Sequence, residues 1–246
     1  MQLLYYRHNK NNPCQIIDRR RISFNELTFM LEGSMDYYVD GNKYTLSSGD
    51  AIFIKSGSLR HRPISTAVCD YVSFNFTDEQ NSGTDFPILI NNIVNGEIRH
   101  LIFCADGFKE KQYENGNALT TQILLCIIDI MKVLRRRDEE SRLVTKIKKY
   151  ISEHLDRKIT LKDIGNATFF SPVYCETVFK KETGIPIIAY VTDTKIEEAK
   201  LMLLEYPMSI NKISETLGFE DLNYFIRVFK KKTGLTPLRY RKQFCK

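Results

Sequence analysis

The chain has 246 residues, enough for two domains of ordinary size that each bury their own core. With 43% hydrophobic and 27% charged residues, the composition is that of a globular protein and excludes a largely disordered chain. Residues 141–246 hold 20 Lys and Arg against 12 Asp and Glu, whereas the other 140 residues hold 16 against 18. This uneven charge predicts that nucleic acid touches one end of the protein only.

The cysteine pattern indicates a reducing compartment. There is no C-x-x-C pair, and most cysteines lie in apolar runs, where the residue acts as a small buried hydrophobe. The six are Cys14, Cys69, Cys104, Cys126, Cys175 and Cys245. The apolar run after Met1 is too short for a signal peptide, and Asp129 interrupts the most apolar stretch of the chain. We therefore predict a cytoplasmic protein without membrane contact.

The first ninety residues are predicted to form short strands. Asp40-Gly41 is a strong hairpin turn, and Ser48-Gly49-Asp50 is a second turn. The predicted strands are 27–31, 36–39, 43–46, 51–54 and 68–76. Many short strands separated by glycine-bearing turns predict a small barrel or jelly roll.

The segment from Gly33 to Pro63, with these two turns and a late histidine, resembles a cupin-like sensor domain. Cupins often hold a metal through two or three histidines and a glutamate, but only His61 falls where such a ligand could lie. The other histidines are His8, His100 and His154. A lone imidazole does not make a transition-metal site, and no G-x-S-x-G-like nucleophile motif occurs. We therefore expect no metal, no cofactor, no catalytic residue and no enzyme activity.

A small-molecule effector remains possible without a metal. Arg60, His61 and Arg62 follow a predicted strand, and they could bind a carboxylate or phosphate in the mouth of the barrel. The alternative is that they are solvated loop residues, and the same alternative applies to Arg19-Arg20-Arg21. The sequence does not identify an effector.

A helical region is predicted between about 97 and 137. One helix begins near Glu97, and a second carries a broad apolar stripe that includes Ile123, Ile127 and Met131. The stripe exceeds what one barrel can cover, which predicts a homodimer through these three residues; the alternative is complete burial within the monomer. Residues 135–140, three arginines and then three acids, are expected to form a charged linker.

The last third of the chain contains one unit used twice. Phe179-Lys180-Lys181-Glu182-Thr183-Gly184 returns fifty residues later as Phe229-Lys230-Lys231-Lys232-Thr233-Gly234. Each copy reads as a short helix, a tight turn, and a second helix with a good N-cap and a glycine stop. The caps are Ser171 and Asp221. Two such pairs, at about 160–184 and 209–234, predict two helix-turn-helix units.

These residues resemble the paired helix-turn-helix domain of the AraC/XylS family of bacterial transcription regulators. The resemblance is densest at Gly218-Phe219, Tyr224-Phe225, 227–231, 233–237 and Tyr240-Arg241. The first copy departs from the pattern, with Phe169 at the usual turn glycine, Gly165 at the usual alanine and Cys175 at the usual leucine. The resemblance implies a cupin-like sensor domain, a dimer and double-stranded promoter DNA as partner.

Base contacts are expected from the outward side of the second helix of each copy. The candidates are Val173, Glu176, Thr177, Asn223, Tyr224 and Arg227. Asn223 suits adenine, Arg227 suits guanine, Val173 suits a thymine methyl group, and Glu176 suits a cytosine amine. Candidate phosphate contacts are Lys180, Lys181, Lys230, Lys231, Arg239, Arg241 and Lys242.

The sequence thus predicts an α+β protein with two domains. Residues 1–137 would form a cupin-like β-barrel with a helical dimerisation region, and residues 138–246 an all-α DNA-binding domain. The predicted function is a sequence-specific transcription activator that works with RNA polymerase and senses an effector. One alternative is a regulator whose barrel only mediates oligomerisation. A second is a cupin enzyme or DNA-repair protein with an AraC-like module.

Overall fold

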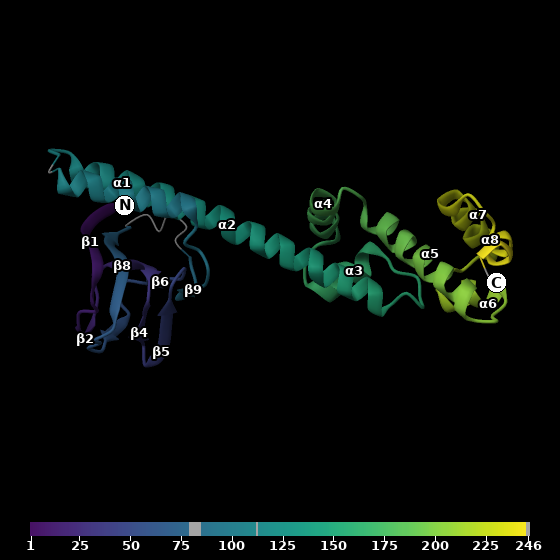
Figure 1. Cartoon of the computed structure of the whole chain (residues 1–246), viewed down its shortest axis with the longest axis horizontal. Helices are drawn as coiled ribbons and strands as arrows, with labels where there is room; N and C mark the ends of the chain where they lie inside the picture. Colours follow the sequence, from purple (N-terminus) through teal and green to yellow (C-terminus); the bar gives the residue numbers. More distant parts are fainter. Residues whose placement is uncertain (79–84, 112, 245–246) are drawn as a thin grey trace. The chain divides into compact units, whose positions relative to one another are not determined.

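The computed structural model describes residues 1–78, 85–111 and 113–244 (Figure 1). The chain divides into two compact units, Met1–Arg135 and Arg136–Lys246.

The N-terminal unit contains two antiparallel sheets followed by helices. Its strands are β1 (Gln2–Pro13), β2 (Ile17–Arg21), β3 (Asn25–Glu32), β4 (Ser34–Val39), β5 (Asn42–Ser47), β6 (Ala51–Ile54), β7 (Leu59–Arg62), β8 (Val68–Thr77) and β9 (Leu89–Ile90). One sheet has the order β1-β8-β3-β6-β9 and the other β2-β7-β4-β5, and they are not closed into a barrel. The mixed α+β class predicted from sequence is confirmed, whereas the predicted closed β-barrel is wrong, because the strands form two separate sheets.

The β4–β5 hairpin forms as its turn sequence predicts. Asp40 and Gly41 both have positive φ, 51° and 88°, which the two-residue turn of a twisted hairpin requires. Three of the strands that sequence analysis missed, β1, β2 and β7, are rich in polar side chains, as in β2, which reads Ile-Asp-Arg-Arg-Arg. Such strands lack the apolar alternation on which the predictions rested.

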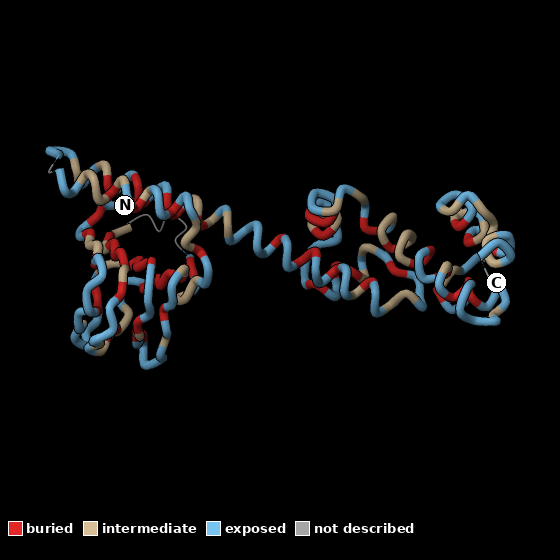
Figure 2. The backbone as a smooth tube through the Cα atoms, viewed as in Figure 1, coloured by how far each residue is buried: buried red, intermediate tan, exposed pale blue. Residues whose placement is uncertain are grey.

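The N-terminal unit has two apolar core clusters, one on each side of β3. Leu27 and Phe29 belong to the cluster shared with the helices α1 (Gly96–Glu110) and α2 (Gly116–Glu153). Met30 belongs to the cluster shared with Tyr37 and Leu46 of the four-stranded sheet. The five-stranded sheet is therefore covered on both faces, which explains the nearly continuous burial of β3 (Figure 2).

The charged stretch at 135–140 is helical and not an irregular linker, because α2 continues to Glu153. Its charges recur at the spacing that places partners on one helix face. Arg136 Nε lies 3.2 Å from Glu140 Oε1, and an Nη atom of Arg142 lies 2.9 Å from Asp138 Oδ2. Residues with this spacing favour a helix. The charged stretch predicted as a linker does contain the division between the two units, between Arg135 and Arg136, and it is helical.

The C-terminal unit is helical. After the end of α2 come α3 (Leu161–Thr168), α4 (Pro172–Thr183), α5 (Ile187–Glu205), α6 (Ile210–Thr216), α7 (Leu222–Thr233) and α8 (Pro237–Phe244). Phe179 of α4 is fully buried in a first apolar cluster, and Phe225 and Phe229 of α7 are fully buried in a second. Each predicted helix-turn-helix unit thus has its own small core.

Candidate functional site

The second helix of each helix-turn-helix unit is held by caps at both ends. Ser171 Oγ accepts a hydrogen bond from Tyr174 N at 3.2 Å, and the Asp221 carboxylate accepts from Tyr224 N at 3.1 Å. Gly184 and Gly234 end α4 and α7 with φ of 80° and 79°. These contacts fix where α4 and α7 begin and end, and so fix the direction of their exposed side chains.

The two turns adopt the same backbone conformation with different residues. Phe169 has φ of 63°, and Gly218 has φ of 62°. The Phe169 side chain is 94% exposed, so the strained backbone is not offset by burial. The glycine at position 165 also has a local reason, because a Cβ there would lie 2.9 Å from Phe170 O and 3.2 Å from the Pro172 ring.

Asn223, Tyr224 and Arg227 are exposed on the first turns of α7. The Arg227 guanidinium lies 5.5 Å from the centroid of the Tyr224 ring, a cation–π contact that orients the guanidinium while it remains in solvent. The structure therefore brings together three groups suited to base edges, a side-chain amide, a phenol and a guanidinium.

The corresponding surface of α4 is poorer in polar groups. Val173 is 76% exposed, and Thr177 is exposed but donates its hydroxyl to Val173 O at 2.8 Å. Glu176 Oε2 accepts a hydrogen bond from Ile187 N at 3.1 Å. That bond satisfies a free backbone amide at the start of α5, where the N-cap residue Pro186 makes no side-chain cap. Glu176 is thus engaged in the protein itself.

The predicted phosphate contacts divide in the same way. Five have exposed side chains and form no ion pair within the described residues: Lys180, Lys230, Lys231, Arg239 and Lys242. Lys181 is also exposed, but its Nζ forms an ion pair with the buried Glu140, 2.6 Å from Oε2. Arg241 is half-buried, and its Nε donates to Leu203 O at 3.2 Å. Arg241 therefore holds the end of α5 in the structure.

Lys195, which the sequence analysis did not single out, joins the two helix-turn-helix units. It lies on α5 and is only 4% exposed, and its Nζ donates to Arg157 O at 2.8 Å and lies 3.4 Å from Gly218 O. Burial lowers the pKa of this ammonium to about 8. A lysine on the apolar side of a helix could have suggested such a role.

In the N-terminal unit, β7 separates the three residues of the proposed effector site. Arg60 and Arg62 are each 4% exposed and point inward, whereas His61 lies on the other face, with its ring 5.7 Å from the Tyr38 ring. This follows from the alternation of side chains along a strand. The expectation that all three are solvated loop residues is wrong for the two arginines.

Arg60 and Arg62 line a pocket of about 340 Å³, which we call the arginine pocket. Its lining residues are Tyr5, Arg7, Gln15, Ile16, Ile17, Arg20, Phe24, Glu26, Arg60, Arg62, Tyr71, Ser73 and Asn75. Arg60 Nε lies 3.0 Å from Glu26 Oε2, while Arg60 Nη1 has no hydrogen-bond partner among the described residues. Arg62 donates to the hydroxyls of Tyr37 and Tyr71 at 3.1 and 3.0 Å. Four arginines against one glutamate give the pocket an excess of positive charge.

His8 lies between two carboxylates and connects β1 to β8 and α1. Its Nδ1 is 2.6 Å from Asp106 Oδ2, and its Nε2 is 2.7 Å from Asp70 Oδ1. Burial alone would lower the pKa of His8, but the hydrogen bonds to Asp106 and Asp70 outweigh it and the pKa is raised. Within residues 1–78, 85–111 and 113–244, no group of three or more His, Cys, Asp or Glu side chains could hold a metal ion.

The structure contradicts the predicted dimer interface at Ile123, Ile127 and Met131. Ile123 is 7% exposed, and Ile127 and Met131 are fully buried in the core of the N-terminal unit. These residues are therefore occupied within the monomer. The same stretch of α2 is long and apolar enough to cross a membrane, with a mean hydropathy of 1.5 in its most apolar window. Asp129 does not prevent that; 33% of this window is buried, and Ile123, Ile127 and Met131 belong to that buried part.

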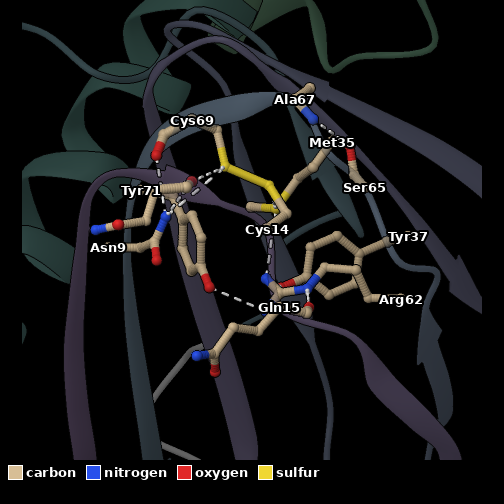
Figure 3. The surroundings of a disulfide bond; sticks show 11 residues. Asn9, Cys14, Gln15, Met35, Tyr37, Arg62, Ser65, Ala67, Cys69 and Tyr71 are labelled. Atoms are coloured by element: carbon tan, nitrogen blue, oxygen red, sulfur yellow. Dashed lines mark hydrogen bonds between the residues drawn. A yellow bond between two sulfur atoms is a disulfide. The ribbon is translucent and has the colours of Figure 1, made fainter.

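The cysteine prediction is also corrected. Cys14 and Cys69 are joined by a disulfide that closes a separation of 55 residues (Figure 3). Cys175 is free and buried, whereas Cys126, which we expected to be buried, is free and exposed. Sequence spacing could not reveal the disulfide, because the pair forms only when β1 and β8 are aligned.

Comparisons with known proteins agree with this architecture. Residues 164–243 match the model of a helix-turn-helix domain, and residues 23–73 match that of a cupin domain. The chain is 27% identical to the uncharacterized HTH-type transcriptional regulator YobQ of Bacillus subtilis, over 94% of this chain and 92% of the relative. It is 36% identical over 93 residues to the arabinose operon regulatory protein of Escherichia coli, which covers 37% of this chain and 32% of that protein.

One further relative combines two activities. The chain is 34% identical over 102 residues to the bifunctional transcriptional activator/DNA repair enzyme AdaA of Bacillus subtilis. The match covers 42% of this chain and 48% of AdaA.

Proposed function

We propose that α7 supplies the main base contacts of this chain, a DNA-binding transcriptional regulator with an AraC-type helix-turn-helix domain and an N-terminal cupin-like domain. The exposed cluster of Asn223, Tyr224 and Arg227 carries the proposal. Asn223 suits adenine and Arg227 suits guanine, while α4 offers Val173 and Thr177 for apolar or weaker contacts. Helix α5 has 19 residues and spans about 28 Å, which supports insertion of α4 and α7 into successive turns of the major groove.

Electrostatic anchoring comes from the five exposed basic residues named above. If each neutralises one phosphate, the affinity of the full-length protein for duplex DNA should fall with salt at a log–log slope of about −4 to −5. A gel-shift titration between low and moderate salt measures that slope. A slope near zero would remove the nucleic-acid proposal for this surface.

We propose further that the arginine pocket holds the effector. Arg60 Nη1 is buried and has no hydrogen-bond partner in the described part of the chain, and Arg62 is oriented by two tyrosines, so a carboxylate or phosphate group would find donors already in place. His61 does not line this pocket; together with Arg19 it lines a separate pocket of about 350 Å³. Thermal-shift measurements with small carboxylates and phosphates test the pocket, and Arg60→Met should abolish any shift.

A homodimer is proposed through a different surface from Ile127. Leu125 and Val133 on α2 are 39% and 51% exposed, and Phe103 on α1 is 73% exposed. A second copy would remove this apolar area from water. Val133→Glu should give a folded protein that sediments as a monomer, whereas Ile127→Glu should unfold the N-terminal unit because it buries an unpaired charge. A dimeric Val133→Glu protein would contradict the proposed surface.

Activation together with RNA polymerase, a cytoplasmic location and the lack of enzyme activity are part of the proposal. The description of AdaA as a transcriptional activator supports the direction of regulation. A promoter-fusion assay with and without the protein decides between activation and repression. A regulator whose N-terminal unit only mediates oligomerisation would respond to no ligand of the arginine pocket.

A further inference from the structure

The Cys14–Cys69 disulfide lies beside the arginine pocket (Figure 3). Cys14 directly follows β1 and Cys69 lies near the start of β8; both are almost fully buried, at 2% and 1% exposure. Cys14 Sγ lies 3.9 Å from Met35 Sδ, and Arg62 Nη1 lies 3.4 Å from the same Met35 sulfur. The disulfide and the pocket are therefore neighbours through Met35 and Arg62.

The residues next to each cysteine form two walls of the pocket. Gln15 follows Cys14, lines the pocket, and accepts a hydrogen bond at its carbonyl from Arg62 Nε at 2.7 Å. Tyr71, two residues after Cys69, lines the pocket and accepts from Arg62 Nη2 at 3.0 Å. A covalent link between Cys14 and Cys69 thus fixes both walls around one guanidinium. Without the link, the Gln15 wall is held by hydrogen bonds from Arg62 and Arg7 and by the pairing of Ile17 with Arg62.

The strand pairing is interrupted where a reactant would approach the sulfur atoms. The β1–β8 register shifts between Asn9 and Asn12, and Asn11 has φ of 50°. Asn11, Asn12 and Pro13 are exposed, and Ile16 on the other side of Cys14 is 55% exposed. One surface segment therefore covers the cysteine pair, and a local opening of that segment is enough to expose it.

We propose that Cys14 and Cys69 are a reversible thiol–disulfide modification site that controls the closure of the arginine pocket, with hydroperoxides as the oxidant class. A DNA-binding regulator works where thiol pools keep most cysteines reduced, so a pair placed for bonding there responds to oxidants. This redox proposal rests on the proposed function, which supplies both the cytoplasmic location and the role of the arginine pocket as the effector site.

The chemistry balances without a cofactor. The thiol of one cysteine attacks the O–O bond of a hydroperoxide, so that an S–O bond forms, the O–O bond breaks, and the thiol proton leaves with the alcohol. The second thiol then attacks the sulfenic acid sulfur; the S–S bond forms, the S–O bond breaks, and its proton leaves in water. The cysteine pair loses two electrons and the hydroperoxide gains two. A dithiol reverses the change by two exchange steps and becomes a disulfide itself.

Trapping experiments on the full-length protein test the cycle. Protein reduced with dithiothreitol and desalted is treated with hydrogen peroxide, alkylated with iodoacetamide and analysed by peptide mass spectrometry. We expect Cys14 and Cys69 to lose alkylation together and to regain it when dithiothreitol is added to the folded protein. Cys14→Ser should abolish the cycle, whereas Cys126→Ser, at an exposed free cysteine, should leave it intact.

Hydrogen exchange of the wild-type protein tests the effect on the pocket. Backbone amides of Asn12 and of residues 14–17 should exchange about tenfold more slowly in the oxidised form, because the bond suppresses local opening. Three results would overturn the proposal: no Cys14–Cys69 bond after peroxide, a bond that dithiothreitol cannot reduce in the folded protein, or a cycle that leaves this exchange unchanged. Because the comparison uses wild-type protein in two states, it stands even if Cys14→Ser does not fold.

The redox proposal and the proposed function fail in different ways. If the protein does not bind DNA, or if the arginine pocket binds no ligand, the Cys14–Cys69 cycle can still be measured by mass spectrometry. If the cycle fails, DNA affinity and ligand-induced thermal shifts of the reduced protein remain as the proposed function requires.

Discussion

Phe169 in the first helix-turn-helix unit and Gly218 in the second stand at the same point of their turns, with φ of 63° and 62°. Beyond the turn the likeness continues. Thr183 Oγ1 donates to Phe179 O at 2.7 Å, and Thr233 Oγ1 donates to Phe229 O at 2.8 Å. The two units therefore have the same kind of backbone although their turn and cap residues differ, because caps, apolar spacing and stop residues are the same in kind.

The exposed surfaces of the two units differ much more. Helix α7 presents Asn223, Tyr224 and Arg227, whereas α4 presents Val173 and uses Glu176 to cap α5. Duplication of a backbone thus does not duplicate its chemistry. From this comparison we expect the second helix-turn-helix unit to discriminate between DNA sequences and the first mainly to position the protein on the DNA.

The largest expected effect is at the turn of the second unit. Gly218→Ala would place a Cβ 2.5 Å from the Arg157 backbone in a left-handed conformation, and we expect a loss of about 3 kcal/mol of unfolding free energy. Gly234→Ala is the matched control, since it shares the positive φ but no atom of residues 1–78, 85–111 or 113–244 lies within 4 Å of the added Cβ. It should lose only about 1 kcal/mol. Hydrogen exchange of α6 and α7 measures both, and equal losses would show that the contact with Arg157 is unimportant.

The pKa of the buried Lys195 can be used to test the contact that this lysine makes between the two helix-turn-helix units. Its folded pKa of about 8 is below the unfolded value, so the unfolded state binds more protons between about pH 8 and pH 10. Stability of the C-terminal unit should therefore rise with pH in this window, by at most about 1.4 kcal/mol per pH unit. Urea denaturation of wild type and Lys195→Met at each pH gives the difference. If the difference does not change with pH, the lysine is not desolvated as the structure indicates.

Specific DNA binding should depend on α7 more than on α4. Arg227→Ala should cost about 1–3 kcal/mol on a cognate site and much less on random DNA, while Val173→Ala should cost about 1 kcal/mol or less. Lys231→Ala is the control for a phosphate contact and should weaken both kinds of DNA alike. Gel-shift competition distinguishes these outcomes. Equal losses on cognate and random DNA for Arg227→Ala would reduce that residue to a phosphate contact.

The sequence predicted the C-terminal unit better than the N-terminal one for a physical reason. Caps, glycine stops and helical periodicity are local signals, and Ser171, Asp221, Gly184 and Gly234 act as predicted. Contacts between distant residues have no local signal.

Some of the missed features are of that distant kind. Examples are the disulfide, the inward direction of Arg60 and the engagement of Glu176 by Ile187 N. The predicted dimer interface was wrong for a similar reason. An apolar stripe on α2 does not indicate whether a second copy or the protein's own sheet covers it.

Glu176→Ala should separate capping from base recognition. Removing the acceptor of the Ile187 N hydrogen bond should lower the stability of the C-terminal unit by about 1 kcal/mol, as loss of a helix cap does. Base preference should not change, because the carboxylate is engaged within the protein. Thr177→Ala, one residue on and exposed, is the control for a change on the same helix. A changed preference at a cytosine in the Glu176→Ala protein would restore the predicted base contact.

The smallest expected effect is a gain in stability at the turn of the first unit. Phe169 holds a left-handed conformation that disfavours side chains by about 1–2 kcal/mol, and it loses little contact on removal because it is 94% exposed. Glycine removes that strain but increases the freedom of the unfolded chain, so Phe169→Gly should gain about 0.5–1 kcal/mol. Phe169→Ala keeps the Cβ and should gain nothing, which makes it the control. If both variants lose DNA affinity without a change in stability, the exposed Phe169 ring would be a DNA contact. The first helix-turn-helix unit would then have a DNA-recognition surface of its own.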